Sequence, residues 1–174
     1  NAIAMPFAHL KNIGNTNEMM HLAVEASLSG MVMMDDKGTI VMVNSMTEKL
    51  FGYNRQELLG HPLEILLPER FRHNHPEYRY AYIGESRSRP MGHGKNVHGL
   101  HKDGHEFPIE VGLNPIETQY GIYVLAAIVD ITERNYAEKM LRLAVEASPS
   151  GMIMSDSNGL IVMVNTTTET LFGY

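Results

Sequence analysis

Histidine is the side chain in this sequence best suited to binding a metal or moving a proton. The chain contains nine histidines, and six of them lie between His73 and His105. His73 and His75 are two residues apart, which places them on different faces of a helix, and the spacing of the later four matches no zinc-binding motif. We therefore expect hydrogen-bonded or surface histidines, and no metal ligands.

Basic and methionine side chains form a second kind of candidate site. Two arginines lie in a segment rich in Gly, Ser and Pro, residues 84–94, which predicts a loop that could bring them to an anionic ligand such as a carboxylate. Several of the thirteen methionines fall on a predicted hairpin, where they either fill ordinary core or line an adaptable cavity. Asn44 ends that hairpin and either bonds a ligand or caps the next helix. The candidate ligand-binding residues are Met33, Met42, Asn44, Arg87, Arg89 and Met91.

Asp130, Thr132 and Arg134 stand where a strand is predicted to end and a helix to begin. The Asp130 carboxylate can accept the first N–H groups of the helix, and Arg134 is within salt-bridge reach four residues on. This joint is either a plain helix cap or a signal relay, in which a strand shift becomes a helix movement. The sequence contains no nucleophile elbow, Walker loop, dinucleotide loop or HExxH motif, so we expect no catalysis.

An internal repeat sets the organisation of the elements that position these residues. The segment Leu22–Tyr53 recurs as Leu143–Tyr174, with an offset of 121 residues and 23 identities in 32 positions. Such a period is the size of a small domain and too long for a solenoid repeat. The predicted organisation is an extension or tag remnant at 1–14, a complete domain at 15–130, a linker helix at 131–147, and the truncated start of a second domain at 148–174.

The hydrophobic pattern predicts an α+β domain. Strands are expected at Gly30–Met34, Thr39–Asn44, Asn96–Lys102, Glu106–Leu113 and Ile122–Val129, with a turn in Asn114–Gly121. Helices are expected at Asn15–Ala26, Ser45–Gly52, Asn54–Leu59, Pro62–Leu66, Glu69–Ile83 (interrupted by Pro76) and Thr132–Ala147. This order implies a five-stranded antiparallel sheet with short helices on one face, flanked by an N-terminal and a C-terminal helix.

Five motifs in a fixed order resemble the PAS domain family, of the sensory-box type with its PAC motif. The resemblance covers Met20–Arg134, and Leu143–Tyr174 resembles the opening of a second such domain. Similar tandem domains occur in bacterial signalling proteins such as sensor histidine kinases and diguanylate cyclases. The motifs are Asp35–Asn44, Glu48–Tyr53, Glu57–Gly60, His101–Glu110 and Val129–Arg134.

The resemblance implies a sensor module rather than an enzyme. In the family, the inner face of the sheet and the short helices enclose a cavity for a cofactor or metabolite. The signal leaves through the Asp-Ile-Thr segment into a helix, which controls an output domain, here outside the chain. The apolar stripes of the two flanking helices predict a homodimer. The alternative is a ligand-free dimerisation or protein-interaction module.

Haem is a third possibility that the resemblance raises. Oxygen-sensing PAS domains carry a proximal histidine on the long helix, a few residues before a Gly-x-Gly-basic stretch. That stretch resembles Gly92–Lys95, and alignment on it places Arg89 at the proximal position. No specific residue therefore supports haem, and the cofactor is unassigned.

The composition of the chain argues against several kinds of partner and chemistry. A net charge of -6, from 14 basic and 20 acidic residues, argues against a nucleic-acid-binding surface. No apolar run approaches the ~20 residues needed to cross a bilayer, so we expect a cytoplasmic fragment without membrane contact. The absence of cysteine excludes disulfides and the flavin–cysteine photoadducts of one branch of the family.

Overall fold

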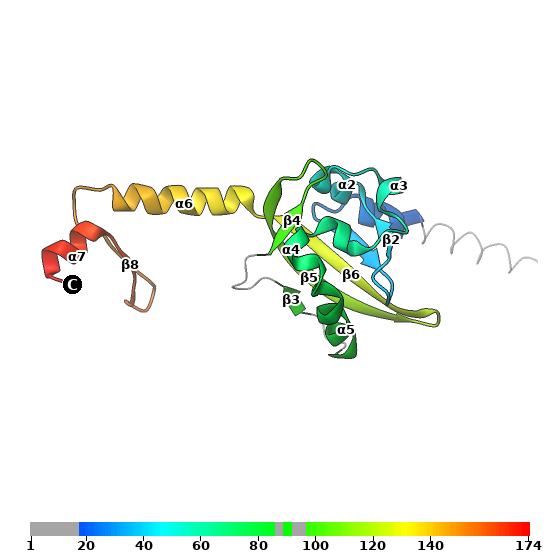
Figure 1. Ribbon diagram of the computed structural model, residues 1–174. Helices are drawn as coiled ribbons and strands as arrows, with labels where there is room; N and C mark the ends of the chain where they lie inside the picture. The colour runs from blue at the N-terminus through cyan, green and yellow to red at the C-terminus, as the bar shows by residue number, and fades with distance from the viewer. Residues whose placement is uncertain (1–17, 86–88, 92–96) are drawn as a thin grey trace, which may run out of the picture. The chain divides into compact units, whose positions relative to one another are not determined.

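The computed structural model of the protein describes residues 18–85, 89–91 and 97–174 (Figure 1). It divides into two compact units, Asn1–Ile131 and Thr132–Tyr174, and each is described by itself.

The first unit is built on an antiparallel sheet. Its strands follow the order β2–β1–β6–β5. Two short strands pair with the other edge of β5, β4 near its start and β3 further along it. The predicted five-stranded antiparallel sheet is confirmed, with its edge position divided between β3 and β4. The strands are β1 Gly30–Met34, β2 Ile40–Val43, β3 Arg89–Met91, β4 His98–Leu100, β5 Glu106–Thr118 and β6 Gly121–Asp130.

Two local predictions for the sheet differ from the structure. The predicted loop at 84–94 contains strand β3, which pairs with Val111–Leu113, and helix α5 enters the same segment and ends at Glu85. The strand predicted at Glu106–Leu113 is longer than expected, because the β5–β6 ladder continues to the pair Thr118 and Gly121, and the turn predicted within Asn114–Gly121 occupies only residues 119–120. Local turn residues were overridden in both places by pairing with a neighbouring strand.

Short helices cover one face of this sheet (Figure 1). Pro76 does not break the long helix as predicted. It lies in the first turn of α5, where a proline is tolerated, and the break precedes it. Helix α2 is capped by the Asn44 side chain, which accepts from Thr47 N–H. Residues 18–25 are helical, followed by α2 Ser45–Phe51, α3 Arg55–Leu58, η1 Leu63–Leu66, α4 Glu69–Arg72 and α5 His75–Glu85.

A β-bulge in the first hairpin decides which side chains face the core. Met33 pairs with Met42, but Met34 pairs with Ile40, so Val41 has no partner. Ile40 and Val43 both enter the core although they are three residues apart. Met33 and Met42 consequently lie on the opposite face of the sheet. The core residues of the unit include Val32, Met34, Ile40, Val43, Phe51, Leu58, Leu66, Tyr82, Phe107, Ile109, Val124, Ala126 and Ile128.

The second unit repeats the opening of the first. Its hairpin shows the same register shift, between Met154 and Ser155. The side chains that match buried residues of the first unit, Ile153, Ile161 and Phe172, are exposed here. Among the described residues, no helix is long and apolar enough to cross a membrane. The elements are α6 Thr132–Glu146, β7 Ile153–Ser155, β8 Ile161–Val164 and α7 Thr166–Phe172.

Candidate functional site

The inner face of the sheet forms one wall of a cavity of about 400 Å³ in the first unit. Helices α4 and α5 and the 3₁₀ turn η1 supply the opposite wall. A volume of roughly 300–1,000 Å³ is typical of small-molecule sites, which are mostly apolar and carry a few placed polar groups. The apolar lining includes Met34, Leu66, Val97, Ile109, Ala126 and Ile128, and the polar lining is His75, Tyr78, Arg79, Tyr82 and His98.

A small polar network holds α5 at the edge of this cavity. The Glu64 carboxylate accepts from His75 Nδ1 at 2.9 Å and from Arg79 Nη1 at 3.2 Å. The Arg79 side chain is only 5% exposed, and its guanidinium packs where any side chain on Gly38 would stand. One turn further on, the Tyr82 hydroxyl donates to the Leu113 carbonyl of β5 at 2.9 Å. A histidine held by a carboxylate through one ring nitrogen is the arrangement common among metal-ligating histidines.

Asn44 caps helix α2 and is hydrogen-bonded to three other segments of the first unit. Its buried Oδ1 accepts from the backbone N–H groups of Met31 (2.8 Å) and Thr47 (3.0 Å). Its Nδ2 donates to the carbonyls of Val24 (3.1 Å) and Ser29 (3.0 Å). The amide is therefore fully used in fastening the N-terminal helix and the hairpin to α2, and it does not line the inner cavity. Asn165 repeats the arrangement in the second unit.

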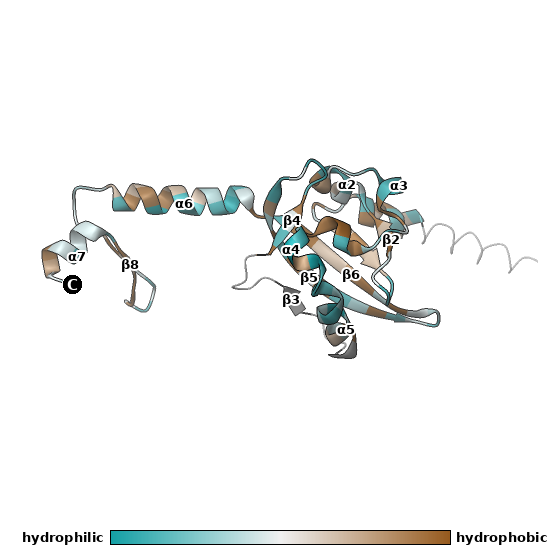
Figure 2. Cartoon of the chain, in the orientation of Figure 1, coloured by the Kyte–Doolittle hydropathy of each residue, from teal (hydrophilic) through white to brown (hydrophobic). Residues whose placement is uncertain are grey.

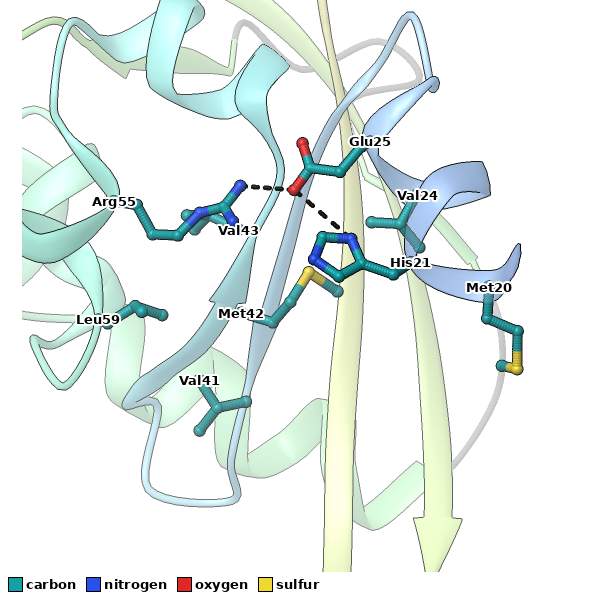
Figure 3. Close-up of a pocket in the computed structure, with 9 residues that line it drawn as sticks. All are labelled: Met20, His21, Val24, Glu25, Val41, Met42, Val43, Arg55 and Leu59. Atoms are coloured by element: carbon teal, nitrogen blue, oxygen red, sulfur yellow. Dashed lines mark hydrogen bonds and ion pairs between the residues drawn. The ribbon is translucent and has the colours of Figure 1, made fainter. Parts of the chain in front are cut away.

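A second, more open hollow of about 370 Å³ lies between the N-terminal helix and β2 (Figure 3). Met42 lines this hollow rather than the inner cavity. Glu25 stands at its rim, where it accepts from Ser45 N–H at 2.9 Å and from Arg55 Nη2 at 2.5 Å. The Ser45 hydrogen bond, with a further contribution from Arg55, holds the pKa of Glu25 below its usual range. These two contacts fix the end of the N-terminal helix to the starts of α2 and α3.

Of the candidate ligand-binding residues, Met33, Met42 and Asn44 do not line the inner cavity. Met33 and Met42 lie on the other face of the sheet, and Asn44 is occupied as described. The backbones of Arg89 and Met91 belong to strand β3 rather than to a loop. Arg87 lies outside the described residues, as do Gly92–Lys95.

The three relay residues stand at the predicted joint. Asp130 is the last residue of β6 and pairs with Ile109, and Ile131 N–H donates to the Pro108 carbonyl at 3.1 Å. Thr132 begins α6, and Arg134 pairs with Glu138 one turn along it, at 3.4 Å. Strand β6, which lines the inner cavity, is thus separated from α6 by a single residue in the sequence.

His75 is the functional candidate that the sequence argument missed. Alignment on Gly92–Lys95 had placed Arg89 at the helical position facing the cavity, but Arg89 lies in a strand. Among the α5 residues that line the cavity, His75 is the histidine. The spacing of His75, Arg79 and Tyr82, which share one helical face at i, i+4 and i+7, was the signal that could have identified it.

Comparison with known proteins places the chain in a family. A family model described as "PAS domain" matches residues 28–133, and one described as "PAS fold" matches residues 139–174. The chain belongs to the PAS domain family. The PAS domain of an HTR-like protein from Haloarcula marismortui superposes with a TM-score of 0.59 at 21% identity, covering 71% of this chain and 98% of that one. A PAS domain from Colwellia psychrerythraea gives 0.57 at 26% identity, covering 68% and 99%.

Relatives of similar sequence are signalling proteins. The oxygen sensor protein DosP of Escherichia coli is 26% identical over 156 residues, which cover 87% of this chain and 19% of DosP. The sensor protein FixL of Bradyrhizobium diazoefficiens is 29% identical over 112 residues, covering 64% and 22%. The probable diguanylate cyclase DgcE of Escherichia coli is 25% identical over 127 residues, covering 72% and 11%. The chain spans about a fifth or less of the length of these relatives, and it corresponds to the PAS sensory part of signalling proteins.

Proposed function

We propose that the first unit is a sensory module that binds a small, mostly apolar ligand or cofactor in the inner cavity. The observation that carries this proposal is an apolar cavity of about 400 Å³ with a few polar groups gathered along α5. A cavity of this kind is the default binding site in a fold of unassigned ligand. No step of this function requires catalysis by the chain itself.

The same strand that lines the cavity supports the second half of the proposal, the relay. Ala126 and Ile128 of β6 line the cavity, and β6 ends at Asp130, two residues before α6 begins. If β6 can take two positions and a ligand binds the domain more tightly in one of them, the ligand shifts the population toward that position. The size of the shift is set by the difference between the two affinities. The shift passes to α6 and from there to an output domain outside the chain. Asp130→Ala in the full-length protein should abolish the dependence of output on ligand, and unchanged regulation would refute the relay.

An absorption spectrum and native mass spectrometry of the purified protein test the binding function. A Soret or flavin band, or an extra mass of a few hundred daltons, supports a cavity ligand. Protein that carries no added mass, and takes up none from a cell extract, supports the ligand-free module instead.

Haem is a second candidate because one observation favours it. His75 lines the cavity and its Nδ1 is held by Glu64, as is common for a histidine whose other nitrogen binds a metal. The mostly apolar lining suits a porphyrin chemically, and haem iron held by a histidine binds diatomic gases. The DosP similarity is consistent with this candidate, since that relative is named an oxygen sensor. His75 would hold the iron, and the apolar walls of the cavity would exclude water from it.

A pair of neighbouring histidines separates haem from other ligands. Haemin added to the wild type should give a sharp Soret band, which His75→Ala should abolish or shift. His73→Ala is the matched control, because His73 is exposed and does not line the cavity. Equal spectra for the two variants would exclude His75 as the iron ligand but would leave the general cavity proposal intact.

We further propose that the flanking helices form a homodimer. Tyr136, Met140 and Leu143 of α6 are all more than 40% exposed and are spaced by four and three residues, as in a coiled-coil seam. Apolar residues lie along α6 among polar ones (Figure 2). Met19, Met20 and Leu22 are exposed on the N-terminal helix in the same way. Light scattering should find a dimer, and Met140→Glu should make it a monomer.

A further inference from the structure

The turn between β4 and β5 gathers three side chains that can bind a metal ion. His105 Nδ1 lies 2.6 Å from Asp103 Oδ1, and His101 Nδ1 lies 2.9 Å from the same oxygen. The two imidazole rings stack with their centroids 4.5 Å apart. One ligand atom from each of the three residues lies within 4.8 Å of the other two.

The backbone, rather than the spacing along an extended strand, brings these groups together. His101 N–H donates to the His105 carbonyl at 2.9 Å, so the two histidines stand across the turn from each other. Gly104, at φ +95°, supplies the left-handed residue that lets the chain reverse. Spacing alone had predicted no shared metal for these histidines, because it took them to lie on separate strands and ignored this reversal.

The rest of the protein holds part of the site in place. The His101 side chain is 23% exposed, and its ring packs over Gly52 at the end of α2. Any side chain at Gly52 would come within 2.3 Å of His101 Nε2, so the glycine provides the space for the ring. Lys102, between the ligands, is tied to Glu57 of α3 through its ammonium group, at 2.6 Å. One imidazole is therefore ordered before any ion arrives.

We propose that His101, Asp103 and His105 form a binding site for a divalent transition-metal ion such as Zn²⁺. Two imidazoles and one carboxylate suit Zn²⁺, Ni²⁺ or Cu²⁺ better than Mg²⁺ or Ca²⁺, which prefer oxygen ligands. Tetrahedral zinc with bonds of about 2.0–2.1 Å needs ligand atoms roughly 3.3 Å apart, so the present contacts have to open by only about half an ångström. The exposed side of the turn leaves the remaining coordination position to water.

An ion at this site would fasten the ends of two strands that line the inner cavity. His98 of β4 and Ile109 of β5 both contribute to that lining, a few residues from the turn. The His105 ring also packs on the Phe107 ring, with their centroids 5.9 Å apart, and the Phe107 ring packs on that of Phe51, with their centroids 5.3 Å apart. Because Phe51 lines the cavity as well, metal binding should stiffen this side of it.

Isothermal titration of the untagged protein with ZnCl₂ tests the site. We expect one Zn²⁺ per chain in the wild type and an affinity at least about tenfold lower in His105→Ala, since even an outer-shell change typically costs ~10–100-fold. His61→Ala, an exposed histidine away from the turn, is the matched control and should bind as the wild type does. Asp103→Asn tests the carboxylate in the same way.

Two results would overturn the proposal. One is a wild type that takes up no Zn²⁺ at millimolar concentration. The other is equal affinity in the wild type, His105→Ala and Asp103→Asn, which would place any bound ion elsewhere. Circular dichroism of each variant establishes that it is folded before the comparison is made. Neither result bears on the cavity ligand, which the spectra of the His75 variants test separately.

Discussion

Replacing Asn44 by alanine should destabilise the first unit more than any other single amide substitution at a helix start. The substitution deprives the N–H groups of Met31 and Thr47 of their acceptor, and the carbonyls of Val24 and Ser29 of their donor. Loss of the helix cap alone typically costs about 1 kcal/mol. A second buried donor left without a partner adds roughly 1–3 kcal/mol. We therefore expect a total loss of about 3 kcal/mol.

Urea denaturation followed by circular dichroism measures this loss directly. At about 4 °C per kcal/mol for a domain of this size, the midpoint of thermal unfolding should also fall by roughly 10 °C. Asn54→Ala is the matched control, because Asn54 is an exposed asparagine at the start of α3. It should cost less than about 1 kcal/mol. A loss for Asn44→Ala no larger than for Asn54→Ala would refute the reasoning.

Three further substitutions follow from the same contacts. Gly52→Ala forces an alanine to φ +73° against the His101 ring and should lower the free energy of unfolding by about 2 kcal/mol or more. Gly60→Ala, at φ +78° with no neighbour within 4 Å, is the control and should cost only about 1 kcal/mol. Equal losses in urea denaturation would contradict this expectation. Tyr82→Phe removes a buried hydrogen bond to β5 and should lower stability by about 1 kcal/mol, and an unchanged urea midpoint would show that the bond contributes nothing. Because the pKa of Glu25 is lowered in the folded state, its contribution to stability is complete above the unfolded pKa of about 4.3 and is lost as the pH falls through the folded value. The urea midpoints of the wild type and of Glu25→Gln should therefore differ at pH 7 and converge in acid. A difference between the midpoints that persists or grows in acid would contradict the lowered pKa.

Much of the fold was predictable because its signals are local. Alternation along Glu106–Leu113 and the apolar stripes of the helices fix the type and order of most elements. The structure divides between Ile131 and Thr132, and the division into a complete domain, a linker helix and the start of a second domain stays a prediction. Strand β3 was not predictable, because Arg89–Met91 becomes a strand only by pairing with β5.

The cavity was harder to predict than the sheet that carries it. The bulge at Val41 reverses the side to which Met42 points, and alternation counted without the bulge assigns that side chain to the wrong face. The sequence suits Asn44 equally for a ligand and for a cap, because one of its hydrogen-bond partners, the Val24 carbonyl, lies on the N-terminal helix twenty residues away in the sequence. The two-residue spacing of His73 and His75 argues against a shared metal, but His75 alone, on one face of α5, lies at the cavity.

A matched pair of substitutions on β6 tests the central claim, that the inner cavity holds the sensed ligand. Ala126 is buried and lines the cavity, whereas its neighbour Ala127 points to the other face of the sheet. Native mass spectrometry of the purified proteins should find the bound small molecule on the wild type and on Ala127→Leu. Ala126→Leu, which places a larger side chain in the cavity, should be folded and should lack the bound molecule. Equal ligand occupancy in Ala126→Leu and the wild type would contradict the account.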